Sequence, residues 1–282
     1  MAVPGDTRNV FTVDLEEWFH VCGVGGALAP GNWDRLPARV EQTTRALLDL
    51  LGLVQVRATF FVVGWVADRY PRLIEAVMAA GHEIGSHGYH HARVYDLGPD
   101  RFRQDLRASL RALAAAGAGS VTMFRAPEWS IDHRSFWALQ TLVEEGISVD
   151  ASMAPTRLVG AVTNPRHPHR RQTPAGPITE IPPLVVDRFG QAMPMGWGWG
   201  LRMSSPSRVV HAIEAVNRAG VPAVLTVHPW ELDPDPPRVR LPARLQFAHY
   251  FRLNGFRARL HDVLRAAPFG SIGDMAGVPI SQ

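Results

Sequence analysis

Three histidines fall within the segment "SHGYHH" (residues 86–91). His87 and His91 are four residues apart, a spacing that one helical turn would convert into two imidazoles on the same face. Two neutral imidazoles and one carboxylate leave coordination positions open for water, as a catalytic Zn²⁺ or similar divalent ion requires. Because the chain has 12 histidines, this spacing alone also fits two exposed loop residues. Residues elsewhere in the sequence must decide between the two interpretations.

Polar residues of the types used in catalysis recur directly after short apolar segments. Asp14 and Glu16 follow "VFTV", and either of them offers a carboxylate to the two histidines. The carboxyl ends of parallel strands meet at one edge of a barrel or sheet, where active sites are built. The other residues that follow such segments are His87, His91, Arg125, Asp150 and His228.

Each of these residues also has an ordinary structural interpretation. An aspartate after a strand, such as Asp14, is often a helix N-cap. Arg125 alone would be taken for a structural ion pair, and His228 alone for a hydrogen-bonded core histidine. Seven such residues at the ends of successive strands favour a shared site over seven separate structural roles.

Short β-branched segments alternate with amphipathic segments along the chain, which predicts parallel strands covered by helices in a barrel or a doubly wound sheet. We expect strands at residues 9–14, 57–64, 121–127, 147–152 and 222–228, with a further short strand before residue 87. We expect helices at residues 39–52, 71–81, 100–117, 133–146, 205–220 and after residue 254.

The alternation breaks at about residues 155–200, where the sequence is rich in Pro, Gly and Arg. This segment is predicted to be a long excursion from the core, with a hairpin around "TEIPPLVVDRFG" (residues 179–190). Within it, "GWGWG" (residues 196–200) predicts either a mobile aromatic loop or a tight turn. No internal repeat or linker divides the sequence, so we expect a single domain over residues 1–282.

The composition excludes several classes of function. A single cysteine, Cys22, excludes a disulfide framework and a multi-cysteine zinc site. All 29 basic residues are arginines and the net charge is only +3. Because the arginines are interspersed with acids, no nucleic-acid partner is expected. No apolar run is long enough to span a membrane and the start lacks a secretory signal, so the expected location is cytoplasmic; the oligomeric state is left open.

Four segments together resemble the NodB-type polysaccharide deacetylases of carbohydrate esterase family 4: "FTVDLEEWFH", "ATFFVVGWVADRYPRLIEAVMAAGHEIGSHGYHH", "FRAP" and "LTVHPWELDP". The likeness covers roughly residues 9 to 265, and the five motifs of the family occur in the family's order. The opening Asp-x-Glu resembles most closely the branch that accompanies bacterial exopolysaccharide export clusters. The resemblance implies a distorted (β/α) barrel of about seven parallel strands and a metal-dependent N-deacetylase activity.

The resemblance also implies a role for each residue that matches a family motif. Asp14 matches the general base, and Glu16, His87 and His91 match the metal ligands. Many members of the family have two adjacent aspartates where this chain has Asp14 and Glu16, so the choice of carboxylate ligand stays open. The expected ion is Zn²⁺, with Co²⁺ or Ni²⁺ as alternatives.

The remaining matches supply the proton chemistry. Arg125 matches the residue that holds the base, His228 the general acid, and Asp150 the acid that tunes this histidine. Amide hydrolysis needs these parts, because the nucleophilic water must lose a proton and the departing amine must gain one. A nearby cation such as Arg125 keeps the carboxylate of Asp14 ionised.

The expected substrate is an N-acetylated glycan, lying as a polymer or oligomer across an open groove. Trp129 and Trp230 directly follow site motifs and are predicted to contact sugar rings, although core packing is the alternative for both. Glu128 stands where relatives usually have a small or apolar residue, which predicts an effect on substrate choice.

Three other functions remain open at this stage. A deacylase of a small or lipid-linked sugar, for example a deformylase, would share every motif and differ only in its pocket. A non-catalytic carbohydrate-binding relative is disfavoured because the base, the acid and both histidines are present. The metal-free, purine-degrading branch of the same fold is disfavoured by the two ligand histidines.

Overall fold

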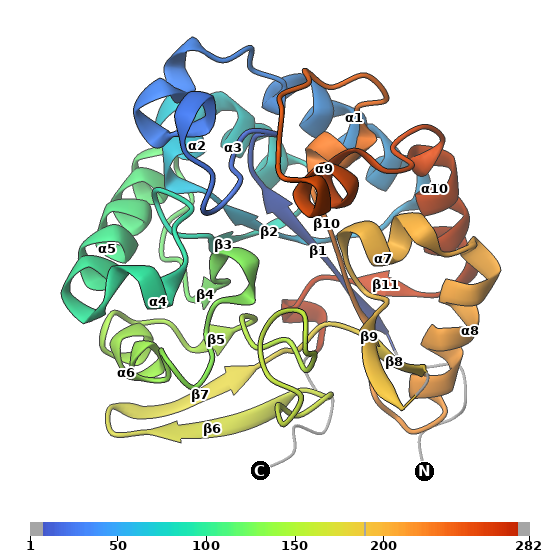
Figure 1. Ribbon diagram of the computed structural model, residues 1–282. Helices are drawn as coiled ribbons and strands as arrows, with labels where there is room; N and C mark the ends of the chain where they lie inside the picture. Colours follow the sequence, from blue (N-terminus) through green and yellow to red (C-terminus); the bar gives the residue numbers. More distant parts are fainter. Residues whose placement is uncertain (1–7, 189, 276–282) are drawn as a thin grey trace.

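One curled sheet forms the centre of the computed structural model, which describes residues 8–188 and 190–275 (Figure 1). Its strand order is β10-β1-β2-β3-β4-β5-β7-β6, and the seven strands from β10 to β7 run parallel. The predicted α/β fold, a distorted barrel of about seven parallel strands, is confirmed. These seven strands are β1 (Asn9–Leu15), β2 (Thr59–Val62), β3 (Glu83–Ser86), β4 (Met123–Phe124), β5 (Val149–Asp150), β7 (Gly176–Glu180) and β10 (Val224–Val227).

Strand β1 lies inside this sheet and is buried along its whole length, as its apolar sequence predicts. Val13 is in register with Phe60 of β2 on one side and with Val227 of β10 on the other. Asp14 and His228 therefore stand next to each other at the carboxyl ends of neighbouring strands. The short strand β11 (Phe269–Gly270) also pairs with β1, at its amino end.

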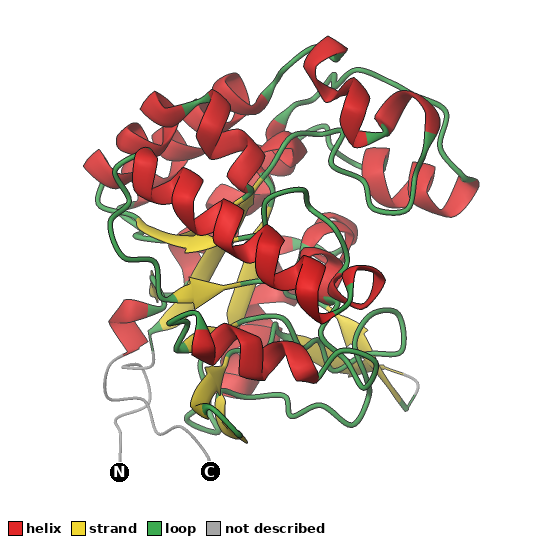
Figure 2. Ribbon diagram, turned by 90° about the vertical axis from the view of Figure 1, so that its left-hand side faces the viewer, coloured by secondary structure: helices red, strands yellow, loops and turns green. Residues whose placement is uncertain are grey.

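The predicted helices are present and pack around the outer side of the strands (Figure 2). Four short helices, α2, α4, α7 and α9, were not expected from the sequence. Among the described residues, no helix combines the length and the apolar character needed to cross a membrane. The helices are α1 (Val40–Val54), α2 (Gly64–Arg69), α3 (Pro71–Ala79), α4 (Val94–Leu97), α5 (Pro99–Ala115), α6 (Trp137–Glu144), α7 (Gly198–Met203), α8 (Pro206–Asn217), α9 (Ala243–Tyr250) and α10 (Phe256–Ala266).

The excursion at residues 155–200 contains two hairpins where one was predicted. The first, β6 (His169–Thr173) with β7, extends the main sheet by one antiparallel strand. The second, β8 (Val185–Arg188) with β9 (Gln191–Pro194), forms a separate two-stranded sheet. The predicted hairpin at 179–190 is therefore wrong, because the two prolines at 182 and 183 separate strands of different sheets.

The "GWGWG" segment is neither a mobile loop nor an isolated turn. Trp197 is buried and bridges to Thr226 of β10, and Gly198 then begins helix α7. Gly196, before this helix, and Gly198, its first residue, each have a structural reason. A Cβ at Gly196 would lie 2.5 Å from the carbonyl oxygen of Val224, and Gly198 has a φ of +39°.

Candidate active site

The carboxyl ends of β1, β3 and β10 bring five of the predicted residues together: Asp14, Glu16, His87, His91 and His228. All but His228 are nearly inaccessible to solvent, and the His228 side chain is 17% exposed. Nε2 of His228 lies 3.9 Å from Oδ2 of Asp14 and 3.7 Å from Oε1 of Glu16. The site therefore has an acid–base pair next to a buried group of metal-ligand types.

Glu16, His87 and His91 fit a divalent ion. One donor atom from each lies within 4.8 Å of the other two. Oε2 of Glu16 is buried, and its 2.6 Å contact with Nε2 of His91 holds these two donor groups together. A buried carboxylate oxygen beside two imidazoles is a donor set that suits Zn²⁺ and similar ions.

Each ligand is also oriented by a neighbour, as metal sites require. Nδ1 of His87 lies 2.7 Å from the carbonyl oxygen of Arg125, which leaves Nε2 for an ion. Burial lowers the pKa of His87 to about 4, so its imidazole is neutral at pH 7 and can act as a ligand. Oε1 of Glu16 accepts a hydrogen bond of 3.0 Å from the indole of Trp230.

The segment that carries the two histidines is a loop, so the predicted helical turn is wrong. His91 has a φ of +50°, which turns its side chain back toward His87. Asp105 of α5 holds this loop by accepting hydrogen bonds from the backbone N–H groups of Tyr89 (2.7 Å) and His90 (3.1 Å). His90 does not join the ligand group; its Nδ1 lies 2.8 Å from the same carboxylate.

Arg125 holds Asp14 as the sequence analysis predicted. Its Nη1 donates to Oδ1 of Asp14 at 2.8 Å and to the hydroxyl of Thr12 at 2.9 Å, and its Nε donates to the carbonyl of Ala151. Both partners of the ion pair are buried, at 1% and 3% side-chain exposure. The guanidinium compensates the negative charge of this buried carboxylate and fixes its orientation.

His228 pairs with Glu231 and not with Asp150, which corrects the predicted partner. Its Nδ1 lies 3.0 Å from Oε2 of Glu231, which also accepts from the His228 backbone N–H at 2.9 Å. Burial alone would lower the pKa of His228, but Glu231, Glu16 and Asp14 raise it to about 9. Sequence reasoning missed Glu231, although an acid three residues after His228 is at the N3 position of a capping box.

Asp150 belongs to a different group. It bonds to the hydroxyl of Ser152 and lies in register with Glu180 of the neighbouring strand β7. Both carboxyl groups are fully buried, and burial raises the pKa of Asp150 to about 6. Asp150 therefore lies at the same edge of the sheet without contacting the histidine assigned to it.

The residues predicted to contact substrate have other roles in the structure. Trp129 and Trp230 are each only 7% exposed, so neither presents an open ring face. Trp129 packs on Trp197, with ring centroids 4.8 Å apart. Glu128 forms an ion pair of 2.6 Å with Arg93, which neutralises the extra acid and ties the loop after β4 to the histidine loop.

Two further buried residues support the site and had no signal in the sequence. Nε of Arg202 donates to Oε1 of Glu231 at 2.7 Å, and both side chains are buried. The thiol of Cys22, which was expected to be a small packed residue, lies 3.5 Å from Nδ1 of His91. These contacts join segments that are far apart in the sequence, so no local pattern could predict them.

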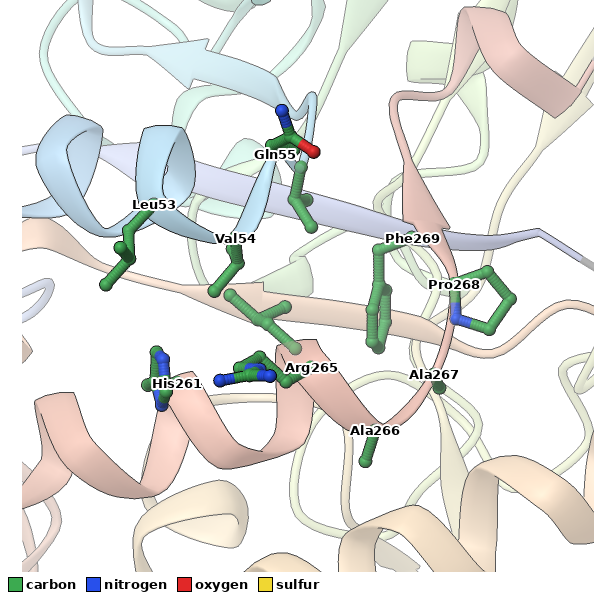
Figure 3. A pocket seen from close by; sticks show the side chains of 11 residues that line it. Leu53, Val54, Gln55, His261, Arg265, Ala266, Ala267, Pro268 and Phe269 are labelled. Atoms are coloured by element: carbon green, nitrogen blue, oxygen red, sulfur yellow. The ribbon is translucent and has the colours of Figure 1, made fainter.

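A pocket elsewhere on the molecule is separate from this site (Figure 3). Its volume is about 630 Å³, and it lies between the last turns of α1 and α10, next to Phe269 of β11. Because β11 pairs with the amino end of β1, this pocket is at the opposite end of the strands from His228. None of the predicted site residues lines it.

Two family models match the chain, one after the other. Residues 32–144 match the model described as "Polysaccharide deacetylase", and residues 151–276 match one described as "Domain of unknown function (DUF3473)". The first region carries His87, His91 and Arg125, and the second carries His228 and Glu231. Strands of both regions belong to the same sheet, where β4 of the first and β7 of the second both pair with β5, which lies between the two regions in the sequence.

Curated relatives resemble parts of the sequence. A peptidoglycan-N-acetylglucosamine deacetylase of Bacillus cereus is 25% identical over 119 residues, which are 38% of this chain and 43% of the relative. A chitooligosaccharide deacetylase of Sinorhizobium fredii is 39% identical over 92 residues, which are 32% of this chain and 43% of the relative. The matched region thus spans less than half the length of each of these relatives.

Solved structures resemble the whole chain in fold. A Mycobacterium smegmatis protein assigned to the polysaccharide deacetylases covers 98% of this chain and 91% of its own, with a TM-score of 0.61 and 20% identity. A family 4 carbohydrate esterase from Streptomyces lividans covers 99% and 100%, with a TM-score of 0.51 and 17% identity. The allantoinase PuuE covers 95% and 88%, with a TM-score of 0.59 and 19% identity. At these identities the likenesses establish the fold alone.

The first prediction concerns the metal ligands. We expect His87→Ala and His91→Ala each to abolish the binding of one divalent ion per chain, because each removes one of the three donors. Metal content is measured by elemental analysis after dialysis against Zn²⁺ and then against buffer. His211→Ala, at an exposed position on α8, is the matched control. Full metal content in both ligand variants would contradict this assignment.

The second prediction concerns the support of the histidine loop. Asp105→Ala removes the acceptor for the two backbone N–H groups of this loop, so we expect metal affinity to fall about 10- to 100-fold. Competition with a fluorescent chelator measures the affinity. Gln104→Ala, at the exposed neighbouring position of α5, should bind metal like the wild type. An unchanged affinity in Asp105→Ala would show that the loop holds its shape without this carboxylate.

The third prediction separates Glu231 from Asp150. In the metal-free protein, Glu231→Gln should lower the pKa of His228 from about 9, because removing the carboxylate destabilises the imidazolium. His228 then loses its proton at a lower pH than in the wild type, which an NMR titration of the histidine side chains detects. Asp150→Asn is the control and should leave the His228 titration in place. The opposite pattern would restore the partner predicted from the sequence.

Proposed function

We propose that this chain, which is related to the NodB-type polysaccharide deacetylases, hydrolyses the N-acetyl groups of amino sugars in a bacterial polysaccharide or oligosaccharide. The proposal is based mainly on the contact between Asp14 and His228, in which Nε2 of the histidine lies 3.9 Å from Oδ2 of the aspartate. The buried donor atoms of Glu16, His87 and His91 lie beside this pair. The names of the curated relatives, peptidoglycan and chitooligosaccharide deacetylases, support the substrate class.

Glu16, His87 and His91 would hold one divalent ion, and we propose Zn²⁺. When bound, such an ion polarises the acetyl carbonyl and lowers the pKa of its water. Glu16 is the proposed carboxylate ligand because its buried Oε2 lies 2.6 Å from Nε2 of His91, another of the proposed ligands. Asp14 is instead committed to Arg125 through its Oδ1.

Asp14 is the proposed general base. Its Oδ1 is occupied by Arg125, and its Oδ2 faces His228. The arginine compensates the charge of the carboxylate and leaves Oδ2 as the atom that can accept a proton from the attacking water. The ion pair also fixes the conformation of the Asp14 side chain, so no conformational entropy has to be lost to position the base during the reaction.

His228 is the proposed general acid, supported by Glu231 as a positioning residue. Because Nδ1 faces Glu231, Nε2 is the nitrogen that points toward the other site residues. The neighbouring carboxylates keep this imidazole protonated, so it can donate a proton to the departing nitrogen. Since His228 lies in the DUF3473 region, we propose that both matched regions form one catalytic domain.

The test is acetate release from N-acetylated glycans by the metal-loaded protein. We expect release from chitooligosaccharides or peptidoglycan fragments, with an efficiency that rises with oligomer length, because binding energy from remote sugars can be used in the transition state. Asp14→Asn and His228→Ala should each lower turnover about 10²- to 10⁴-fold with near-normal metal content. His211→Ala serves as the active control.

Three results would overturn this assignment. Unchanged turnover in Asp14→Asn or His228→Ala would remove that residue from the mechanism. Equal efficiency on monosaccharide and oligomer would favour a small-sugar deacylase, and release of formate in place of acetate would identify a deformylase. Glycan binding without any hydrolysis by the metal-loaded protein would identify a binding module.

A further inference from the structure

Residues 238–259 contain six of the chain's 29 arginines and none of its 26 acidic residues. The interspersed pattern of segments such as residues 100–117 therefore does not hold here, and without these six the chain would have more acids than bases. Five of the arginines are exposed and the sixth, Arg259, is half-buried. We call this set the basic patch: Arg238, Arg240, Arg244, Arg252, Arg257 and Arg259.

The basic patch is not neutralised by the protein itself. Elsewhere, arginines such as Arg103 and Arg107 form ion pairs with carboxylates, in this case those of Glu144 and Glu145. Within the part of the chain that the structure describes, no ion pair joins a member of the basic patch to an acidic side chain. Burial and the positive charges of Arg252 and Arg202 lower the pKa of Arg259. The positive charges of this region are therefore close enough to repel one another.

The basic patch lies directly beside the active site. The inner side of α9 carries His249, whose ring stacks on Trp230 at 4.2 Å, and Trp230 donates to Glu16. Arg202, which pairs with Glu231, also donates to the carbonyl of Phe251 just after α9. Arg244 is exposed on α9 itself, and Arg238, Arg240 and Arg252 are exposed in the segments that flank this helix. Figure 1 shows α9 close to the end of β1 where Asp14 lies.

We propose that the basic patch binds the negative groups of the substrate, which is an acidic N-acetylated polysaccharide with carboxylate-bearing sugars. This inference rests on the proposed function and names its substrate class. Guanidinium groups form paired hydrogen bonds with carboxylates, and several unpaired ones along a surface favour a repeating anion over a single one. A polymer bound along the patch would place a neighbouring N-acetyl group near His228.

The test compares two probes of equal length, hyaluronan oligosaccharides, which carry a carboxylate on every second sugar, and neutral chitooligosaccharides. We expect the wild type to bind hyaluronan at least about tenfold more tightly at about 50 mM salt, and to lose this preference at about 500 mM. The triple variant Arg238→Gln, Arg240→Gln, Arg244→Gln should lose about tenfold in hyaluronan affinity and none in chitooligosaccharide affinity.

The matched control is Arg72→Gln, Arg101→Gln, Arg111→Gln, which removes the same charge from exposed positions on α3 and α5. Equal losses in both triple variants would overturn the proposal, as would the absence of hyaluronan binding. Competition by single-stranded DNA of equal charge as strong as that by hyaluronan would show a non-selective polyanion surface and also overturn it. Acetate release from neutral chitooligosaccharides tests the proposed function separately, so the two can fail independently.

Discussion

The buried ion pair between Arg125 and Asp14 is the interaction on which the rest of the site depends. The guanidinium holds the proposed base, while the backbone carbonyl of the same residue lies 2.7 Å from Nδ1 of His87. One residue at the end of β4 thus orients both the proposed proton acceptor and one of the proposed metal ligands. Removing one partner of a buried pair leaves an uncompensated charge and typically costs about 3–5 kcal/mol. The site and the stability of the sheet edge are therefore coupled.

A second buried ion pair, Arg202 with Glu231, fixes the carboxylate that faces His228, as Arg125 fixes Asp14. Arg202 of α7 contacts both the loop after β10 and the end of α9, so the proposed general acid is held by segments of the second matched region. Three of the five non-glycine residues with positive φ in the described chain, His91, Glu128 and Trp129, lie in loops of this site. Such conformations cost free energy and persist only where the surrounding contacts impose them.

The fold and most of the site could be predicted because they depend on patterns that are local in the sequence. Buried strands such as β1 appear as apolar runs, and in a parallel sheet residues like Asp14 and His228 must meet at one edge. The partner of His228 was predicted wrongly as Asp150, because Asp150 and Glu231 both lie near this edge and the packing decides which of them faces the imidazole. The same reason applies to Trp129 and Trp230, since a sequence does not show whether an indole faces solvent or Glu16. The turn at His91 was missed because its conformation is imposed by Asp105, 14 residues further on.

The position of β1 between β2 and β10 has a consequence for how this protein could have evolved. One neighbour of β1 comes from the polysaccharide-deacetylase region and the other from the region of unknown function. A chain without residues 151–276 would lose the β10 pairing and expose the backbone of its central strand, an open edge that promotes aggregation. The second region is thus not a module that recombination could add or delete freely. Changes in it have to preserve the register with β1, and substrate range can diverge mainly through the loops and short helices between the strands.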